Sequence, residues 1–528
     1  MKDTSFYFNG RLYRAPENLT VAEALIHNNK FIFGRSIRYH RARSYFCGKG
    51  LCSHCMVSID GIGNVRSCIT PLKEGMKIDS QNYLLSVNFD PLRFIDYVFN
   101  PYFNYARTKL TRSFMAPLFN YAMRKIAGTE ILPEKVTIKK SEKLEVHVLV
   151  IGAGKYGTET AIVSSEFGAK VALIDTVPDI RYDDRAMPYI NKGTLKIYPY
   201  TSAIYLSKTD TGWITGLFTR DRTYIEVNSH AVVIATGTEP SLPLFGNNDL
   251  PGIMTHSAFE KLIDKGVDIN GRVAVEIHNK IPYSIMEKLK KRRINTVFIK
   301  NDEINAELSG YGEVVVGNIK YAYGGSRIAG IVTDRNDKIK AAMVAVDDRD
   351  HRATELLFQT GCRMKYDGRG FYPEINEYLE CTVPALFVAG DVAGNLVDPL
   401  KAAKIAGINS AIVSAKVPYD MRKYESGYTD HSEIRINNKV DDTKQKIFVC
   451  SCEDVVYKEL EDMVKNGYDT LEKIKRYGGI GTGVCQGKLC LLNTKTTLKD
   501  NTVNITTQRP PLMPIKMGSL AGDADEKI

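Results

Sequence analysis

Eight of the ten cysteines fall into two groups of four whose spacing suits metal binding. The groups are Cys47, Cys52, Cys55 and Cys68, and Cys450, Cys452, Cys485 and Cys490. A secreted disulfide scaffold of this length would spread its cysteines differently, so we predict metal ligands and a reducing, cytoplasmic compartment. Cys362 and Cys381 have no partner spacing, and we expect ordinary core or surface thiols at these positions.

The C-terminal group consists of two close pairs that can wrap a small metal cluster from two sides. A helical span from about Val455 to Lys475 is predicted between the pairs, with Gly467 as a stop signal. Glycines crowd the second pair, at positions 478, 479, 481, 483 and 487. Because glycine has no Cβ, backbone N–H groups could reach cluster sulfur there. A 2Fe–2S cluster is favoured, and a tetrahedral zinc site stays open because four thiolates also suit zinc.

The N-terminal group begins with the C-x4-C-x2-C spacing of plant-type 2Fe–2S ferredoxins. Before it, Asn9-Gly10 separates two alternating runs and predicts a β-hairpin. Thr20 and Glu23 form the capping box of a predicted helix. The order of hairpin, helix and cysteine loop predicts a ferredoxin-like β-grasp domain. His54 lies between two of the cysteines, and we expect an exposed loop residue rather than a ligand.

A dinucleotide-binding pattern begins at Val146. Residues 146–157 read VHVLVIGAGKYG, a buried strand that runs into a glycine-rich turn and a helix, and a second strand ends at Asp175. The turn would place a phosphate at the helix N-terminus, and Asp175 would accept hydrogen bonds from ribose hydroxyls. Lys155 and Tyr156 stand where small residues are commoner, which could alter how the pyrophosphate sits.

Two later strands, 231–235 and 385–389, complete a flavoprotein-like nucleotide domain. The loop after the first can approach the nucleotide, and the carboxylate after the second could hydrogen-bond a ribityl hydroxyl. The predicted nucleotide-binding residues are Gly152, Ala153, Gly154, Gly157, Asp175, Thr236, Gly237, Gly390 and Asp391.

A reductase that binds two nucleotides would carry a second glycine-rich fingerprint. In this chain that second fingerprint is degenerate. Residues 271–282 supply the strand but not the glycines, and Glu276 would meet a phosphate unfavourably. We therefore expect that the second, nicotinamide-type site has decayed, which argues against a self-sufficient NAD(P)H reductase.

The net charge of +10 is mild for 528 residues. Two basic clusters are expected to be solvated faces rather than nucleic-acid sites: Arg35, Arg38, Arg41 and Arg43, and Lys135, Lys139, Lys140 and Lys143. An anionic cofactor or acidic partner protein is a further possible use of the arginines. The start of the sequence does not read as a signal peptide, and no run of eighteen apolar residues predicts a membrane span.

These features predict a multidomain α/β protein. The expected domains are a 2Fe–2S ferredoxin-like domain (1–95), a helical connecting arm (96–143), two parts of a Rossmann-type dinucleotide-binding domain (144–265 and 341–425), a degenerate second nucleotide-binding-like domain (266–340), a helical 2Fe–2S domain (426–505) and a C-terminal tail (506–528). A membrane-surface helix is the alternative for the arm.

With these motifs in hand, the chain resembles the α subunits of the heteromeric sarcosine oxidase, opine oxidase, dye-linked proline dehydrogenase and hydrogen cyanide synthase family over nearly its whole length. The matching stretches are residues 35–43, 112–117, 124–128, 248–254, 475–490 and 509–511, together with the dinucleotide fingerprint. Long sarcosine oxidase α chains lack both cysteine groups and continue into a folate-binding domain. This chain is therefore more similar to the dehydrogenase branch, which has iron–sulfur centres and no folate half.

The resemblance implies an oxidoreductase component that acts on CH–NH donors of the proline, hydroxyproline, sarcosine or opine type. Substrate oxidation would occur on a flavoprotein β subunit of the amino-acid oxidase fold, with FMN at the subunit interface. This chain would hold FAD, or NAD or ATP at the same site, and would relay electrons through two 2Fe–2S clusters. The C-terminal cysteines match the bacterioferritin-associated-ferredoxin-like (BFD-like) motif. Two other classes stay open: a stand-alone NAD(P)H-dependent flavin reductase and a non-catalytic iron–sulfur scaffold.

Overall fold

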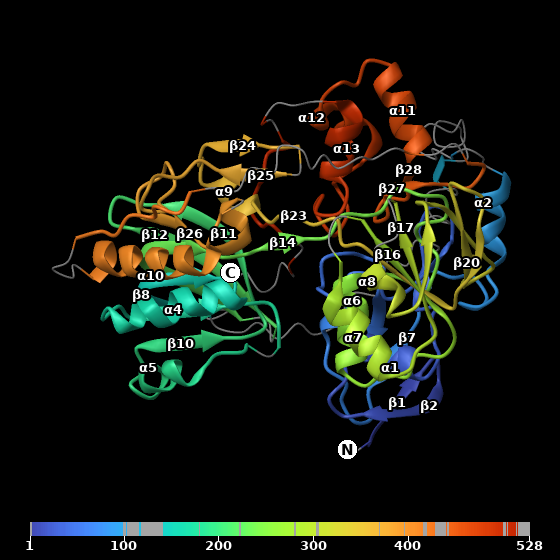
Figure 1. The fold of residues 1–528 in the computed structure, drawn as a ribbon, viewed down its shortest axis with the longest axis horizontal. Coiled ribbons are helices and arrows are strands. Elements are labelled where there is room, and N and C mark those ends of the chain that lie inside the picture. Colours follow the sequence, from blue (N-terminus) through green and yellow to red (C-terminus); the bar gives the residue numbers. More distant parts are fainter. Residues whose placement is uncertain are drawn as a thin grey trace. The chain divides into compact units, whose positions relative to one another are not determined.

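A computed structural model gives the fold of the chain (Figure 1). It describes residues 3–98, 102, 116–117, 141–178, 180–220, 223–278, 281–301, 306–368, 370–394, 396–415, 420–427, 440, 443–499, 503, 505–513 and 515. Most of the predicted connecting arm and the end of the tail lie outside these residues. Within the described part, no helix has the length and apolar character needed to cross a membrane.

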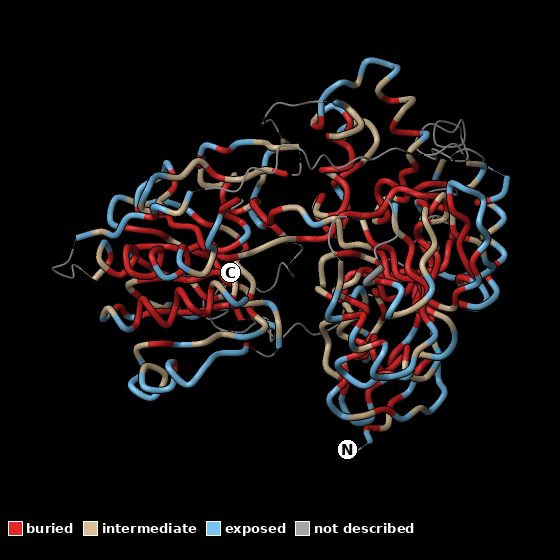
Figure 2. The backbone as a smooth tube through the Cα atoms, viewed as in Figure 1, coloured by how far each residue is buried: buried red, intermediate tan, exposed pale blue. Residues whose placement is uncertain are grey.

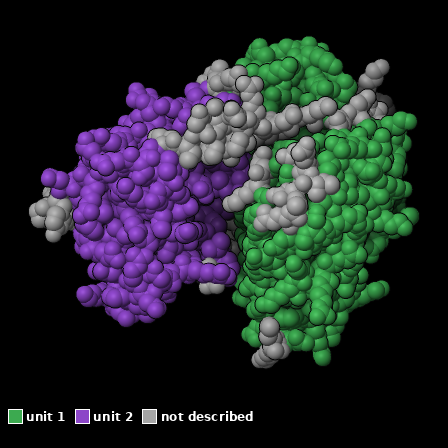
Figure 3. All heavy atoms as spheres, viewed as in Figure 1, with its two compact units in different colours: residues 1–133, 240–349, 437–500 green, residues 134–239, 350–436, 501–528 purple. Residues whose placement is uncertain are grey.

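The chain divides into two compact units, each assembled from three separate stretches (Figure 3). Unit 1 consists of Met1–Pro133, Pro240–Arg349 and Asn437–Asp500, and unit 2 of Glu134–Glu239, Asp350–Ile436 and Asn501–Ile528. All eight clustered cysteines belong to unit 1, and all nine predicted nucleotide-binding residues belong to unit 2.

Unit 1 begins with the predicted hairpin, formed by β1 (Asp3–Phe8) and β2 (Arg11–Pro16). Asn9 and Gly10 make the turn with φ of 48° and 76°, the left-handed conformation that this dipeptide favours. The predicted capping box is also present at α1 (Val21–His27): Thr20 accepts from the amide of Glu23, whose carboxylate accepts from the amide of Thr20. Local sequence therefore determines where the hairpin turns and where α1 begins.

A mixed five-stranded sheet completes the N-terminal part, in the order β2-β1-β7-β5-β6. Its other strands are β5 (Met56–Ile59), β6 (Ile62–Arg66) and β7 (Lys77–Asp79), and β3 (Gly34–Arg35) pairs with β4 (Ala42–Arg43) nearby. Phe6, Leu25 and Val57 are buried between the sheet and α1. The expected ferredoxin-like β-grasp domain is confirmed.

The second part of unit 1 is a parallel sheet in the order β15-β22-β16-β17-β18. Its strands are β15 (Ile253–Thr255), β16 (Val273–Ile277), β17 (Thr296–Lys300), β18 (Glu313–Val316) and β22 (Met343–Val346). Helices α6 (His256–Asp264) and α7 (Tyr283–Lys291) share one hydrophobic core with α1 and this sheet. A meander of β19 (Ile319–Gly324), β20 (Ile328–Thr333) and β21 (Lys338–Lys340) adjoins it.

The C-terminal part of unit 1 is small and mostly helical. It contains β27 (Phe448–Cys450), β28 (Val455–Val456), α11 (Tyr457–Lys465), α12 (Leu471–Gly478) and α13 (Leu491–Leu498). The predicted span over 455–475 is therefore two helices rather than one. The chain turns between them at Gly467, whose φ of 85° ends α11.

Unit 2 is built on a mixed sheet in the order β10-β9-β8-β13-β12-β11, with β26 paired to β13. The strands are β8 (Glu142–Ile151), β9 (Val171–Ile174), β10 (Leu195–Tyr198), β11 (Thr201–Lys208), β12 (Trp213–Thr219), β13 (Tyr224–Ile234) and β26 (Leu386–Val388). Helices α4 (Lys155–Glu166) and α10 (Pro399–Ala415) pack together on it. Figure 2 shows the central strands of this sheet and most of α4 and α10 as buried.

Shorter elements connect these layers. In unit 1 they are η1 (Ser67–Ile69), η2 (Pro91–Arg93), α2 (Phe94–Val98) and α8 (Ala306–Ser309). In unit 2 they are η5 (Asp184–Ala186), α5 (Met187–Asn191), β14 (Thr238–Glu239), β23 (His351–Arg352), α9 (Glu355–Gln359), β24 (Met364–Tyr366), β25 (Phe371–Pro373) and η6 (Gly390–Ala393).

Candidate metal centres and nucleotide site

The four N-terminal cysteines come together in a buried sulfur group. Cys47, Cys52 and Cys55 lie on the loop before β5, and η1 supplies Cys68. The sulfurs of Cys47 and Cys52 are 3.3 Å apart, and Cys68 contacts both Cys47 and Cys55. Each of the pairs Cys47–Cys52 and Cys55–Cys68 offers two sulfurs, the number that one iron of a 2Fe–2S cluster takes from a four-cysteine site.

Backbone amides of the cysteine loop point at this sulfur group. The amides of Lys49 and Cys52 donate to Cys47. Contacts from the thiols of Cys52 and Cys68 have the larger effect on the pKa of Cys47. Together with the two amides, these contacts hold that pKa well below its usual value. Gly48 adopts a φ of 62°, and a Cβ there would lie 2.7 Å from the Tyr45 hydroxyl. The turn therefore requires glycine.

The four C-terminal cysteines form a second group. Cys450 ends β27, Cys452 lies in the following turn, and Cys485 and Cys490 lie on the turns before α13. Cys485 contacts Cys452 and Cys490, and Cys490 contacts Cys450. The amides of Gly487 and Leu489 donate to Cys485. All except the half-buried Cys452 are buried, so this group too offers pairs of sulfurs shielded from water.

Glycine brings the two halves of the C-terminal group together. A Cβ on Gly483 would lie 2.4 Å from the Cβ of Cys452. Since real Cβ atoms do not approach so closely, the turn that carries Cys485 can pack on the first pair only with glycine at position 483.

Among the described residues, no group of three or more His, Cys, Asp and Glu side chains is arranged around a single metal-ion position.

The two sulfur groups are neighbours within unit 1. Ser53, on the first cysteine loop, hydrogen-bonds the sulfur of Cys452. Arg66 Nη2 donates to the carbonyl oxygen of Val484 at 3.0 Å. Cys47, Cys52 and Cys485 belong to one hydrophobic core. Spacing along the chain gave no sign of this adjacency, because the groups are about 400 residues apart in sequence.

His54 lies at the contact between the two sulfur groups, and the expectation of an exposed loop residue is wrong. The residue is 2% exposed, and its ring stacks on Phe46 with centroids 4.9 Å apart. It interacts electrostatically with both Cys47 and Cys485. Burial, reinforced by the charge of Arg43, lowers the pKa of His54 to about 3, so the imidazole is neutral.

The four arginines that precede the first cysteine loop are buried, and the predicted solvated face is wrong for them. Arg41 binds Asp249 at 2.7 Å and Asp96 at 2.7 Å. Arg43 binds Asp249 at 2.8 Å and also contacts Asp454. Arg38 binds Glu459 on α11 at 2.8 Å, and Arg35 donates to the backbone carbonyl of Val87. Carboxylates distant in sequence thus neutralise the cluster and tie the first cysteine loop to the C-terminal part of the unit.

The predicted nucleotide residues of unit 2 gather at one edge of the sheet. Strands β8, β9, β13 and β26 are parallel, so the segments after their carboxyl ends lie side by side. These segments carry the glycine-rich turn, Asp175, Thr236-Gly237 and Gly390-Asp391. Asp175 accepts hydrogen bonds from the amides of Ala153 at 2.6 Å and Val177 at 3.0 Å. The carboxylate thus holds the turn against the end of β9.

The three glycines of the turn have different surroundings. Gly152 has a φ of 105°, and a Cβ there would lie 2.3 Å from the Ala235 carbonyl oxygen. A Cβ on Gly157 would lie 1.9 Å from the Gly152 carbonyl oxygen, so α4 packs on the turn only with glycine. Gly154 at the N-cap of α4 has no atom within 4 Å of an added Cβ. This open space before a helix N-terminus fits a phosphate.

Tyr156 fills part of the region between the turn and η6. A Cβ on Gly390 would lie 2.5 Å from Cδ2 of the Tyr156 ring. The pKa of Tyr156 is raised by burial and by the nearby Asp391 and Asp398. The side chain that departs from the usual fingerprint therefore stands next to the predicted Asp391.

Glu276 lies at the end of β16 in unit 1, where the second fingerprint would be. Its carboxylate is buried, binds Arg349 at 2.9 Å and accepts from the amide of Asp347. Both interactions are internal to the protein, which agrees with a degenerate site.

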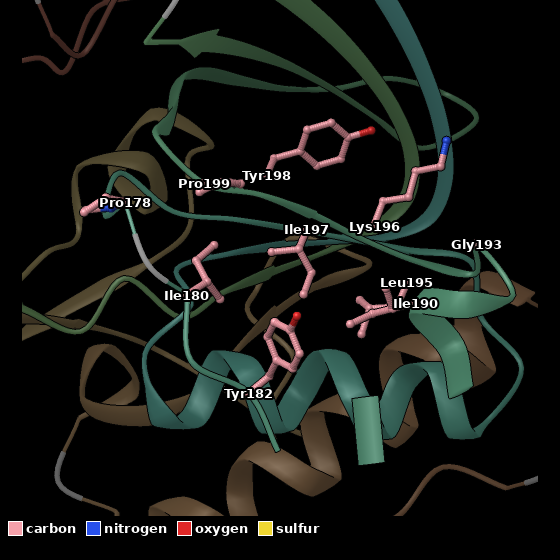
Figure 4. Close-up of a pocket in the computed structure, with 10 residues that line it drawn as sticks. All are labelled: Pro178, Ile180, Tyr182, Ile190, Gly193, Leu195, Lys196, Ile197, Tyr198 and Pro199. Atoms are coloured by element: carbon pink, nitrogen blue, oxygen red, sulfur yellow. The ribbon is translucent and has the colours of Figure 1, made fainter. Parts of the chain in front are cut away.

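Two further features of unit 2 could not be predicted from the spacing of residues in the sequence. Cys362 and Cys381 are both buried and contact each other through their sulfurs, and this contact lowers the pKa of Cys362 to about 7. A hollow of about 600 Å³ lies between β10 and the chain at Pro178, Ile180 and Tyr182 (Figure 4). None of the predicted nucleotide residues lines it.

Three family models match the chain. They are a 2Fe-2S iron-sulfur cluster binding domain over residues 2–83, a pyridine nucleotide-disulphide oxidoreductase over 124–254 and a sarcosine oxidase A3 domain over 444–524.

The chain is similar to two curated relatives and one solved structure over long stretches. It is 26% identical to the alpha subunit of the Rhizobium meliloti sarcosine oxidase over 98% of this chain, which spans 57% of that relative's length. It is 24% identical to an opine oxidase subunit of Agrobacterium tumefaciens over 71% of this chain and 91% of the relative. The structure of L-proline dehydrogenase from P. horikoshii matches 98% of both chains with a TM-score of 0.72 at 20% identity, which shows a shared fold.

Proposed function

The chain belongs to the family of the sarcosine oxidase α subunits and their opine oxidase counterparts, and from this premise we propose that it is the electron-transfer subunit of a heteromeric, FAD-dependent amine or amino-acid dehydrogenase or oxidase. The substrate class is an amine with a CH–NH bond, of the proline, hydroxyproline, sarcosine or opine type. A β subunit of the amino-acid oxidase fold oxidises this substrate, and FMN lies at the interface between the subunits.

The adjacency of the two buried cysteine groups carries this proposal. An electron relay needs redox centres that are close together and shielded from water. Ser53 and Cys452 touch across the contact, and Arg66 reaches the loop of Cys485, so centres held by the two groups would be neighbours. A relay also has a chemical purpose, since a flavin accepts two electrons from its substrate and many acceptors take one at a time.

The residues of unit 1 fit two 2Fe–2S clusters. Cys47, Cys52, Cys55 and Cys68 would hold one, and Cys450, Cys452, Cys485 and Cys490 the other. When bound, the clusters supply one-electron transfer. The protein contributes thiolates in pairs, amide N–H groups aimed at sulfur and, around seven of the eight cysteines, a buried environment. Hydrogen bonds to sulfur and exclusion of water are the means by which a protein sets the potential of such a centre.

The residues of unit 2 fit a nucleotide whose phosphate lies at the N-terminus of α4. The site consists of Gly152, Ala153, Gly154, Gly157, Asp175, Thr236, Gly237, Gly390 and Asp391. We assign FAD to it, with NAD or ATP as the alternatives at the same position. The open space at Gly154 supports a phosphate there, and the Tyr156 ring beside Gly390 makes the flavin end the narrower part of the site.

Co-expression with candidate flavoprotein partners tests the proposal. The complex, purified anaerobically, should contain iron and acid-labile sulfide in equal amounts and should reduce an artificial dye when an amine substrate is added. Either chain alone should be inactive with amine and dye. A chain that contains zinc without sulfide would contradict the relay, and rapid bleaching of this chain alone by NADH would identify a stand-alone reductase instead.

A further inference from the structure

His54 presents a buried nitrogen without a protein partner at the contact between the two cysteine groups. Its Nε2 atom is inaccessible to solvent and makes no hydrogen bond. Burying a polar group without a hydrogen bond is unfavourable. Because buried polar groups are nearly always paired, such an atom in a native protein calls for an acceptor supplied from outside the polypeptide.

The surroundings of His54 determine which acceptor this is. The backbone amide of His54 donates to the sulfur of Cys52, so the residue is part of the first cysteine loop. The side chain interacts with Cys47 of the first group and with Cys485 of the second. The charged groups that act on it, Arg43 and Asp249, are already bound to each other. The ring therefore lies close enough to a cysteine of each candidate cluster site to interact electrostatically with both.

The ring of His54 is held in one place. It stacks on Phe46 with an interplanar angle of 30° and a centroid separation of 4.9 Å. An imidazole carries an N–H in either protonation state, and a thiolate-bound cluster offers sulfur acceptors with partial negative charge. A fixed N–H donor at this point can act on a cluster without becoming one of its ligands.

We infer that His54 is a positioning residue of the relay, whose Nε2–H donates a hydrogen bond to sulfur of a cluster at the contact between the two cysteine groups and raises the reduction potential of that cluster. This inference rests on the proposed function, since it requires that the cysteines hold iron–sulfur clusters. The hydrogen bond favours the reduced cluster, which carries one more negative charge and is the stronger acceptor. His54 thereby favours residence of the electron on the cluster that accepts its hydrogen bond.

Two variants in the co-expressed complex separate the donor from the ring. His54→Phe keeps an aromatic ring on Phe46 and removes the N–H, whereas His54→Gln keeps an N–H donor and removes the ring. EPR-monitored redox titration reports each cluster separately. In His54→Phe the equilibrium constant for electron exchange between the two clusters should shift about tenfold away from the cluster that loses the hydrogen bond. This shift corresponds to about 59 mV for a one-electron couple. His54→Gln should recover most of this shift.

A measurement on the unaltered chain does not depend on how the variants fold. Complex labelled with ¹⁵N-histidine and reduced to one electron per relay should show a ¹⁵N coupling to a cluster spin in pulsed EPR. Two normal cluster signals with no ¹⁵N coupling, or equal potentials in wild type and His54→Phe, would overturn the inference and leave the proposed function intact. An equal shift in both variants would also overturn it, because packing rather than the donor would then be responsible. Absence of iron–sulfur signals from wild type would contradict the proposed function itself.

Discussion

Nη1 of Arg43 lies 2.8 Å from Oδ2 of Asp249, and both side chains are at least 95% buried. The same guanidinium contacts Asp454, two residues after Cys452. Arg43 lies four residues before Cys47, so a single side chain connects the loops of both cysteine groups to the middle of unit 1. The stability of the unit and the placement of the two candidate clusters therefore depend on the same ion pairs.

Removing the charge of Asp249 should destabilise unit 1 strongly. Asp249→Asn leaves the buried guanidinium groups of Arg41 and Arg43 short of a carboxylate, and a broken buried pair costs roughly 3–5 kcal/mol. The matched control is Asp469→Asn, which removes the exposed pair with Lys473 and should leave stability almost unchanged. Urea unfolding followed by fluorescence measures both. Equal losses in the two variants would contradict the role of burial.

The same pair makes stability depend on pH in the acid range. Burial alone would raise the pKa of Asp249, but Arg41 and Arg43 overcome burial and lower it from 3.8 to about 2. Because the folded pKa is depressed, this contribution to stability is complete above about pH 4 and is lost as the pH falls toward 2. In urea titrations of wild type and Asp249→Asn, the stability difference should shrink over this interval. A constant difference would show that Asp249 does not titrate as described.

Cys485→Ser should remove one iron–sulfur signal and keep the other. Cys485 contacts Cys452 and Cys490 and accepts two amide hydrogen bonds, so its loss disrupts the C-terminal group alone. EPR of the reduced complex should retain the signal of the N-terminal cluster, and amine-dependent dye reduction should fall at least tenfold. Cys381→Ser is the control, since Cys381 belongs to neither group and both signals should survive. Loss of both signals in Cys485→Ser would show that the sites do not form independently.

Gly154 and Gly157 should respond differently to alanine. Gly154→Ala places a methyl group in open space, so the fold should be unaffected while FAD binds about tenfold more weakly. Gly157→Ala drives a Cβ against a carbonyl oxygen and should cost about 1–3 kcal/mol of stability. Gly325→Ala, where nothing lies near the added methyl group, is the control for stability. Unchanged FAD affinity in Gly154→Ala would place the phosphate elsewhere.

Local chemistry made much of the fold predictable. Asn9-Gly10 and the Thr20–Glu23 capping box act over a few residues, and the structure has both where the sequence places them. The same holds for the strand, turn and helix of the dinucleotide pattern, because Gly152 and Gly157 make close contacts within the motif or with the strand beside it. The grouping of each set of four cysteines was likewise visible in their spacing.

Burial of polar residues was not predictable, since it depends on partners far along the chain. Arg38, Arg41 and Arg43 read as a basic surface until Asp249, Asp454 and Glu459 are placed beside them, more than 200 residues later. His54 read as an exposed loop residue, but it is buried against Phe46 and interacts electrostatically with Asp249 and Cys485, which are far along the chain. The end of α11 at Lys465 was visible locally, because Gly467 follows it in the left-handed conformation. The helix stops there although apolar residues at helical spacing continue beyond it.

Unit 1 is assembled from stretches that leave the ribosome at very different times. When residues 1–98 have been synthesised, Arg43 still awaits Asp249, and Asp454 emerges only about 400 residues after Arg43. The N-terminal cysteine loop therefore reaches its final charge balance late, and we expect metal loading to wait until residues 437–500 have been synthesised. Ribosome-bound chains halted before residue 437 would then take up iron poorly, while chains that extend beyond residue 500 would take it up readily.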